Sequence, residues 1–224
     1  MSASAALTTP QDHDDHHLAA KAWPEDPHFG VASAGKIGMW IFLLSDCLSF
    51  AGLLLAYGIL RGGADTWRHA GEPSLGITFT AFLTFLLICS SVTMVFAYAA
   101  ALDGNRSQAV RYLGLTVLGG VLFLCGQMQE YFGILHFVFG SEGLVAEGLH
   151  FGRSHYATTF FCITGFHGMH VFAGVTYLTV ILVRTAKGKY DAGRVDHIEI
   201  AGLFWHFVDL IWILVFTLVY LIPE

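Results

Sequence analysis

The chain has 224 residues, of which 55% are hydrophobic and 12% are charged, and its formal net charge is −6. Soluble domains carry about 25% charged residues, so this composition excludes an ordinary soluble domain and predicts a membrane protein. The modest negative charge provides no basic surface, which excludes nucleic acid as an expected partner.

The first 35 residues are polar and rich in histidine, aspartate and proline. Such a composition predicts a flexible N-terminal tail, followed by one membrane domain over residues 36–224. Residues 12–17 contain only histidine and aspartate, a composition that can bind metal. The simpler interpretation is a solvated tail.

Five apolar stretches follow, at about residues 36–60, 76–102, 110–139, 154–183 and 198–222. Each is near or above the roughly 20 residues that a helix needs to cross a bilayer. The stretches are continuously apolar and do not alternate, which favours helices over a β-barrel. The predicted fold is therefore an all-α bundle of five transmembrane helices, of which the third and fourth are long enough to tilt or project.

The cationic residues predict the orientation of these helices. Eight lysines and arginines fall on the N-terminal side of the spans and three on the opposite side. The eight are Lys21, Lys36, Arg106, Arg111, Arg184, Lys187, Lys189 and Arg194, and the three are Arg61, Arg68 and Arg153. Because cytoplasmic loops carry the excess of positive charge, we expect a cytoplasmic N-terminus and a periplasmic C-terminus.

Asp46 lies near the middle of the first apolar stretch. A charged group at the bilayer centre costs about 2.5–3.5 kcal/mol on insertion scales, so this carboxyl needs a partner or a proton. Two interpretations are open. The side chain handles protons or faces a partner protein, or it is a hydrogen-bonded acid that only fixes helix packing.

Two pairs of polar residues share helix faces in the third and fourth stretches. Gln127 and Glu130 are three residues apart, and a polar clasp between helices is the favoured interpretation. His167 and His170 have the same spacing, which can ligate a metal or haem. We favour hydrogen bonding across helices for the histidines, and we predict neither a metal site nor a catalytic residue in this chain.

The fifth stretch carries Glu199, His206 and Asp209 on one stripe, with Trp205 on an adjacent stripe. A carboxyl–imidazole–carboxyl stripe can serve as a proton relay. The competing interpretation is a charge-compensated contact between helices, which we favour because several stretches carry such groups.

Four segments, in this order, resemble subunit III of the cytochrome c and quinol oxidases: Lys36-Ile37-Gly38-Met39-Trp40 with Ser45-Asp46, Gln127-x-x-Glu130-Tyr131, Thr164-Gly165-Phe166-His167-Gly168-Met169-His170-Val171, and Trp205-His206-Phe207-Val208-Asp209-x-x-Trp212. The resemblance runs from about residue 36 to the C-terminus. The sequence resembles the shorter bacterial members most, since the two N-terminal spans of the longest members are absent.

The resemblance implies a subunit without a cofactor of its own. It packs against subunit I, which holds haems and copper, beside a subunit II that holds copper in cytochrome c oxidases. It supports proton uptake and stability during turnover, and it binds phospholipid. Asp46 stands where many members carry a membrane-embedded acid, and Arg184 precedes Glu199 as the lipid-contacting arginine of the family does. The resemblance also implies lipid contact or helix packing for His167, His170 and Trp205.

The expected function is therefore that of subunit III of a proton-pumping haem-copper oxidase in aerobic respiration, in a bacterial inner membrane. Electrons come from cytochrome c, or alternatively from quinol, through other subunits. Three further functions compete with this one: a subunit associated with nitric oxide reductase, a metalloprotein that carries electrons through its histidines, and a proton-coupled transporter that uses Asp46 and Glu130. For the oxidase, we expect Asp46, Glu130, His206 and Asp209 to lie together near the side of proton uptake.

Overall fold

A computed structural model describes residues 34–68, 72–73, 75–134, 142–190 and 195–222. These residues form five long helices: α2 (Ala34–Gly62), α3 (Ile77–Leu102), α4 (Arg106–Phe132), α6 (His155–Ala186) and α7 (Asp196–Val215). A π-helical segment, η1 (Phe216–Leu221), continues α7. No strand occurs in the described ranges, and all five helices are long and apolar enough to cross a membrane. This confirms the predicted all-α fold, while the predicted tail and its His/Asp tract lie outside the described residues.

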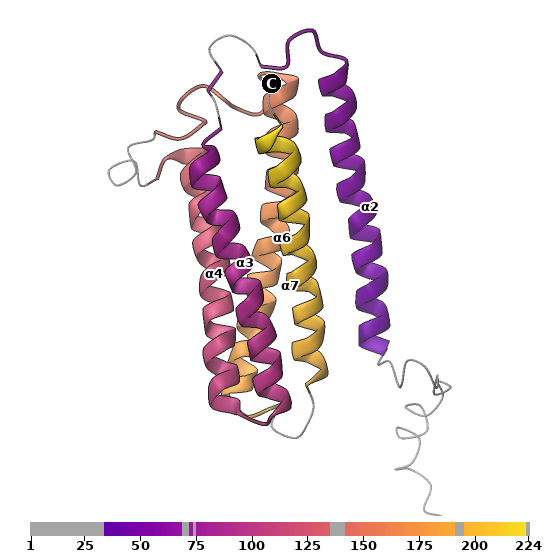
Figure 1. The fold of residues 1–224 in the computed structure, drawn as a ribbon, viewed down its shortest axis with the longest axis vertical. Coiled ribbons are helices and arrows are strands. Elements are labelled where there is room, and N and C mark those ends of the chain that lie inside the picture. Colours follow the sequence, from indigo (N-terminus) through magenta and orange to yellow (C-terminus); the bar gives the residue numbers. More distant parts are fainter. Residues whose placement is uncertain (1–33, 69–71, 74, 135–141, 191–194, 223–224) are drawn as a thin grey trace, which may run out of the picture.

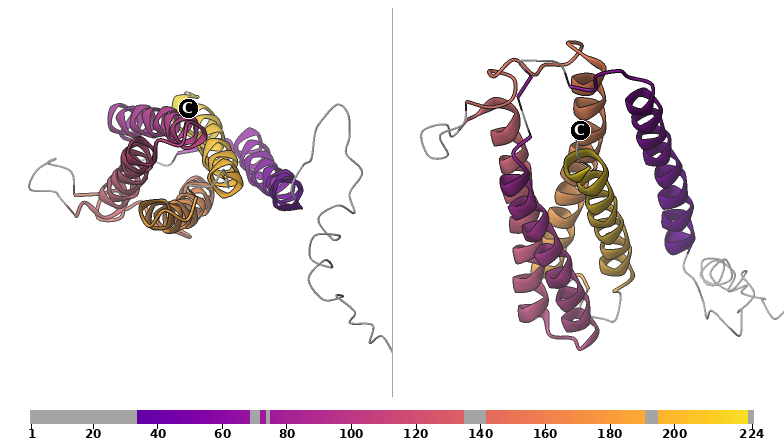
Figure 2. Two further views of the ribbon diagram at one scale, coloured as in Figure 1. Left: turned by 90° about the horizontal axis from the view of Figure 1, so that it is seen from below. Right: turned by 45° about the horizontal axis from the view of Figure 1, so that its top comes forward.

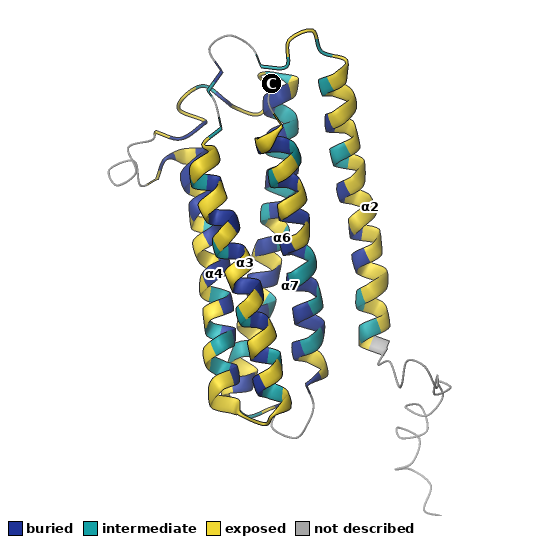
Figure 3. Cartoon of the chain, viewed as in Figure 1, coloured by how far each residue is buried: buried dark blue, intermediate teal, exposed yellow. Residues whose placement is uncertain are grey.

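Four of the helices form a ring in which each packs against the next, in the order α3, α4, α6, α7 and back to α3. Helix α2 stands beside this ring and packs against α6 and α7 (Figures 1 and 2). Buried residues line the inner faces of the ring, whereas α2 is exposed along most of its surface (Figure 3). In the most apolar part of each helix, 56% of the α7 residues are buried but only 17% of the α2 residues. Helix α7 is therefore central and α2 peripheral.

The helix ends are set by local capping. Asn105 accepts a hydrogen bond from the backbone N–H of Gln108, so α4 begins at residue 106 and not at 110. Gly133 has φ of 60° and donates its N–H to Gln129 O, a left-handed cap that ends α4. Helix α4 therefore ends before the expected limit of this span at residue 139, and residues 135–139 lie outside the described residues.

The fourth span is 32 residues long, from the cap at Ser154 to Ala186. Its length is about 48 Å at 1.5 Å per residue, which exceeds the roughly 30 Å hydrocarbon core. The sequence-based expectation that this helix tilts or projects is consistent with that length. Its N-cap is firm, since the Ser154 hydroxyl accepts the Ala157 N–H at 3.0 Å.

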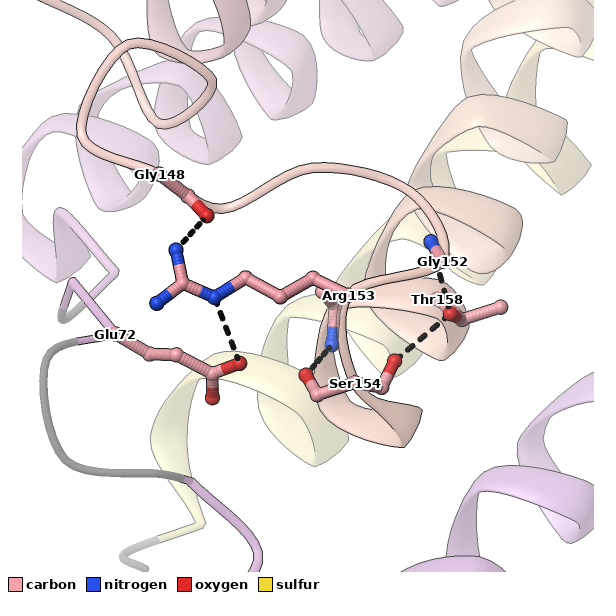
Figure 4. A network of polar contacts seen from close by, with 7 residues as sticks. Glu72, Gly148, Gly152, Arg153, Ser154 and Thr158 are labelled. Carbon is pink, nitrogen blue, oxygen red and sulfur yellow. Dashed lines mark hydrogen bonds and ion pairs between the residues drawn. The ribbon is translucent and has the colours of Figure 1, made fainter.

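A polar network joins the loops at the end of the bundle where α2 ends and α6 begins (Figure 4). The Arg153 Nε lies 3.9 Å from the buried carboxylate of Glu72, and the guanidinium also donates to the carbonyl of Gly148. Next to it, Gly152 donates its backbone N–H to the Thr158 hydroxyl. The network connects the α2–α3 loop to the start of α6, and it thereby helps to position the upper end of α2.

Candidate functional site

The intramembrane polar residues contact one another in groups that lie at different depths. At the end of the bundle that contains the start of α2, Lys36 pairs with Glu199 at 2.8 Å. Near the middle, Asp46 meets His170 across α2 and α6. At the opposite end, Glu130 lies between the first turn of α3 and η1. Glu130 is thus separated from Asp46 along the bundle, which corrects the expectation that they lie together.

Asp46 is 6% exposed, and its Oδ1 lies 3.0 Å from His170 Nε2. The other ring nitrogen of His170, Nδ1, lies 2.8 Å from the carbonyl oxygen of Phe166. Because a carbonyl oxygen only accepts, Nδ1 carries a proton. One further proton then gives either an imidazolium–carboxylate pair or a neutral imidazole beside a protonated carboxyl. Both forms have zero net charge, so the pair solves the problem of a charge in the membrane.

Aromatic rings enclose the Asp46–His170 pair. The imidazole of His170 contacts the rings of Phe166 and Phe50, with centroid separations of 4.6 and 5.3 Å. The second carboxyl oxygen of Asp46 is buried and has no hydrogen-bond partner among the residues described. The pair therefore joins the peripheral helix α2 to α6 in an apolar surrounding, where a hydrogen bond is electrostatically strong.

Gln127 belongs to a chain of hydrogen bonds whose direction is determined. Thr164 donates its hydroxyl to Phe160 O, so Tyr131 must donate to Thr164 Oγ1, at 2.6 Å. The amide nitrogen of Gln127 then donates to Tyr131 Oη at 3.0 Å and to Thr164 O at 2.7 Å. The network joins α4 to α6, which agrees with the polar clasp predicted from the Gln127–Glu130 spacing, although the two side chains contact different helices.

His167 and His170 have different polar partners, although the ring of Phe50 contacts both imidazoles. His167 is fully buried, and its Nε2 lies 3.1 Å from Val208 O on α7, whereas His170 faces Asp46 on α2. The His167 ring also lies against Trp212, with centroids 4.6 Å apart. Within the described part of the chain, no group of three or more histidine, cysteine, aspartate or glutamate side chains is placed to hold a metal. The two histidines hold α6 to α7 and to α2.

The polar stripe on α7 is divided among different partners. Glu199 accepts from Tyr98 at 3.0 Å in addition to its pair with Lys36. His206 Nδ1 lies 2.6 Å from Ser91 Oγ on α3, and one turn later Asp209 Oδ1 is buried without a hydrogen-bond partner in the described ranges. Glu199 reaches α2 through Lys36 and α3 through Tyr98, and His206 reaches α3 through Ser91. The ion pair of Glu199 with Lys36 is the contact that fits the charge-compensated interpretation.

Trp205 is 1% exposed and donates its indole N–H to Ser90 Oγ at 3.1 Å. It packs against Gly120 of α4 and Gly174 of α6, so that the indole sits where three helices meet. Trp205 is therefore a packing residue, one of the two roles that the resemblance implied for it.

Sequence reasoning missed the partners of these groups. Ser91, Tyr98, Thr80 and Tyr220 each complete a polar contact, yet in the sequence they are ordinary membrane residues. A hydroxyl in a span carries no sign of its partner until the neighbouring helix is known. Lys36 is a cation at the start of a span, and in the sequence this position indicated the orientation of the helix. It did not indicate the ion pair with Glu199.

Comparison with known proteins decides the family. The family model for cytochrome c oxidase subunit III matches residues 24–223. The chain belongs to this family. It is 35% identical to the cytochrome c oxidase subunit 3 of Corynebacterium diphtheriae, over 84% of this chain and 87% of that protein. It is 33% identical to the cytochrome bo(3) ubiquinol oxidase subunit 3 of Pseudomonas putida, over 83% and 84%, and 30% identical to the cytochrome c oxidase subunit 3 of a Bacillus species, over 93% and 97%.

As a member of the cytochrome c oxidase subunit III family, the chain is a multi-pass membrane protein and a subunit III of a haem-copper oxidase. Respiration and proton pumping follow from the family. Relatives of both the cytochrome c and the quinol type match at similar identity.

Arg184 lies in the last turn of α6 and is exposed, close in sequence to Lys187 and Lys189. These cations gather at the same end of the bundle as Lys36. An arginine at a helix end suits a lipid phosphate. The contact of Arg184 with lipid, which the resemblance to the oxidase family implies, stays a prediction.

Two substitutions of Glu130 distinguish the loss of its hydrogen-bonding side chain from the loss of its carboxyl group alone. Its two carboxyl oxygens accept from Thr80 Oγ1 at 3.0 Å and from Tyr220 Oη at 3.1 Å. Glu130→Ala is expected to lower the stability of the oxidase subunit by about 1–3 kcal/mol, because both hydroxyls lose a buried partner. Glu130→Gln should lose less than half as much, since the amide can still bond both hydroxyls. The thermal inactivation midpoint of the purified complex measures the difference, and equal losses in the two variants would contradict it.

Proposed function

We propose that this chain is the non-catalytic subunit III that packs on subunit I of a proton-pumping oxidase in a bacterial inner membrane. The haems and copper lie in subunit I, with further copper in subunit II. The chain's own contribution is to support proton uptake and to keep the complex active during O₂ reduction. Cytochrome c is the proposed donor, the type of the Corynebacterium relative, and quinol is the alternative, the type of the Pseudomonas relative.

The Asp46–His170 pair is the observation that supports this role most directly. It is a buried, electrically neutral pair between a peripheral helix and the central bundle. Moving its shared proton changes the charge of both groups without changing the charge of the pair. Such a pair can stabilise the assembly and can exchange a proton with a neighbouring water or subunit. Both properties suit a subunit beside a proton pathway.

The positions of the other polar groups indicate which of them share the proposed proton-related role of Asp46. His206 and Asp209 lie on α7, which packs against α2, and His206 borders a groove that Cys47 and Leu43 of α2 also line. Glu130 lies at the far end, between Thr80 and Tyr220. We therefore assign a proton-related role to Asp46, His206 and Asp209, and a packing role to Glu130, Gln127 and His167.

The charge distribution supports the proposed orientation. The described cations Lys36, Arg106, Arg111, Arg184, Lys187 and Lys189 lie at or beyond the end of the bundle where α2 begins. The opposite end carries Arg61, Arg68 and Arg153. This asymmetry favours a cytoplasmic α2 start and a periplasmic end of η1.

Affinity purification of the tagged chain in mild detergent tests the proposal. We expect haem absorbance bands and a co-purifying large subunit I, together with oxidation of reduced cytochrome c by the purified complex. Oxidation of quinol but not of cytochrome c would replace the donor and keep the subunit assignment. A colourless chain that purifies alone would contradict the assignment and favour a transporter.

A further inference from the structure

Helix α2 joins the rest of the bundle along one narrow stripe of side chains. Among the described residues of α2, the buried ones are Leu43, Asp46, Phe50 and Tyr57. They follow one another at intervals of three, four and seven residues, so they lie on one face of the helix, which we call the α2 seam. The spacing is that of the a and d positions of a coiled coil, where apolar side chains normally pack. Asp46 therefore occupies a position of the α2 seam that an apolar residue would usually fill.

The packing of α2 beside this seam is loose. A groove of about 390 Å³ lies between α2 and α7, with Cys47 on one wall and His206 on the other. A Cβ on Gly52 of α2 would meet no atom within 4 Å, whereas a Cβ on Gly120 in the ring would lie 2.5 Å from Trp205. In membranes, close fits of this second kind hold helices together. Because α2 has fewer of them, its polar contacts contribute more to its attachment.

The surroundings of the Asp46–His170 pair provide no group that would stabilise a net charge. Asp46 Oδ1 is bonded to His170 Nε2, while Asp46 Oδ2 is buried without a hydrogen-bond partner in the described part of the chain. His170 Nδ1 is already bonded to Phe166 O, and its ring lies against Phe50. With one shared proton the pair is neutral. It becomes negative when this proton is lost and positive when a second proton is gained.

The other titratable groups at this height belong to the two helices that pack against α2. His167 comes from α6, and His206 and Asp209 come from α7. The described hydrogen bonds of His167 and His206 run to α7 and α3, away from α2. Closer to the start of α2, Lys36 pairs with Glu199 of α7. The Asp46–His170 pair is therefore the ionisable contact of α2 near the middle of the membrane, and the Lys36–Glu199 pair is a second one near the end.

A net charge near the centre of a bilayer is unfavourable enough to shift an equilibrium by roughly a hundredfold. Water can solvate the charged pair only if the α2 seam opens, and the groove beside Asp46 gives α2 room to move. We propose that the charge of the Asp46–His170 pair controls the α2 seam. Helix α2 packs against α6 and α7 while the pair is neutral, and the seam opens and admits water when the pair gains or loses a proton. This goes beyond the proposed function, because it depends on the contacts of α2 and not on the electron donor.

Pulsed electron paramagnetic resonance on the intact complex in lipid nanodiscs tests this opening. Spin labels are placed at Leu44→Cys on α2 and Leu210→Cys on α7, two exposed positions that border the groove, after the native cysteines are replaced by alanine. We expect one short distance at neutral pH and a longer one at both ends of the pH range in which the complex keeps its haem. The matched control is Met128→Cys with Phe172→Cys, which borders a groove inside the ring and should keep one distance throughout. A label distance between α2 and α7 that does not change over this range would overturn the proposal.

Variants of the pair separate the two transitions. Asp46→Asn can still bond His170 Nε2 but has no proton to lose, so its seam should stay closed at high pH and open at low pH. His170→Gln leaves a carboxyl that is neutral when protonated, so its seam should open at high pH and stay closed at low pH. Lys36→Met/Glu199→Gln removes the other ionisable pair of α2 and should keep both transitions. Opening of Asp46→Asn at high pH, as in the parent, would reject the pair as the controlling group.

Hydrogen–deuterium exchange of the unlabelled complex keeps the test decisive if the labelled chains fail to assemble. After correction for the intrinsic effect of pH on exchange, peptides of α2 should lose protection at both ends of the pH range, and peptides of α4 should not. Equal protection of α2 at every pH would reject the opening. Haem content and co-purifying chains are recorded for each sample, so a failed oxidase assignment and a seam that does not open are separate results.

Discussion

Replacing Asp46 by alanine should leave the haem content of the complex unchanged and shorten its active lifetime during turnover. The substitution removes the acid that joins α2 to His170 at 3.0 Å, and it leaves a ring nitrogen without a partner in an apolar surrounding. Side-chain hydrogen bonds within membranes are worth about 1–2 kcal/mol, so the docking equilibrium of α2 should shift by roughly 5- to 30-fold. Oxygen consumption, followed until activity is lost, measures the lifetime.

A double-mutant cycle with His170→Ala distinguishes the pair from general damage to α2. If the contact acts as a unit, Asp46→Ala/His170→Ala should lose little more than either single variant. Ser49→Ala is the matched control. Ser49 is exposed on the same helix, and its hydroxyl donates to the backbone carbonyl of Ser45 within α2. An Asp46→Ala complex that inactivates at the parental rate would show that the carboxyl has no part in turnover stability or proton supply.

Gly120→Ala is expected to destabilise the bundle by about 1–3 kcal/mol, the usual effect of overpacking a core. A Cβ at this position would lie 2.5 Å from Trp205 Cη2 and 2.5 Å from Val175 Cγ2. Trp205 cannot move aside easily, because it is 1% exposed and its indole N–H is bonded to Ser90. The contact between α4, α6 and α7 must therefore open. The thermal midpoint of the purified complex in detergent and its yield measure the loss.

The same helix offers a control for this prediction. A Cβ at Gly114 would meet no atom within 4 Å, so Gly114→Ala should be neutral or slightly stabilising through its better helix propensity. The thermal midpoint of Gly126→Ala should lie between those of Gly120→Ala and Gly114→Ala, because its Cβ would contact the flexible methyl groups of Leu83 at 2.4 and 2.7 Å. Equal midpoints for Gly120→Ala and Gly114→Ala would mean that the close packing at Trp205 is not needed for stability.

The hydrophobic pattern alone determined that five helices cross the membrane and, approximately, where each lies. In a bilayer every backbone polar group must be bonded within its own segment, so a long apolar run has almost no alternative to a helix. The ends of the helices were harder to predict, because the capping residues decide where each helix begins and ends. Gly133 ended α4 seven residues before the expected limit, through a left-handed backbone that the apolar run gave no sign of.

The sequence also identified the buried polar side chains, and the motifs around them indicated the oxidase family. Asp46, Glu130, His167 and His206 are unusual in membrane spans, and each does have a polar contact in the bundle. Their spacing placed them on shared helix faces and favoured contacts between helices, and the observed partners do come from other helices. Which helix each side chain reaches did not follow from the spacing. Which side chains meet depends on how the helices pack, and helix packing in a membrane is decided by close fits such as Gly120 against Trp205.

Only the tertiary structure separated Glu130 from Asp46 and paired Asp46 with His170. Both residues are acids within membrane spans, and the sequence treats them alike. Helices α2 and α6 run antiparallel, which brings their midpoints together and places Asp46 beside His170, whereas Glu130 lies at the last turn of α4 beside η1. The pocket between Tyr57 and Tyr220 likewise exists only because the ends of α2 and η1 meet the starts of α3 and α6. The local pattern determines which segments are helices, and the packing of distant segments determines which side chains form a site.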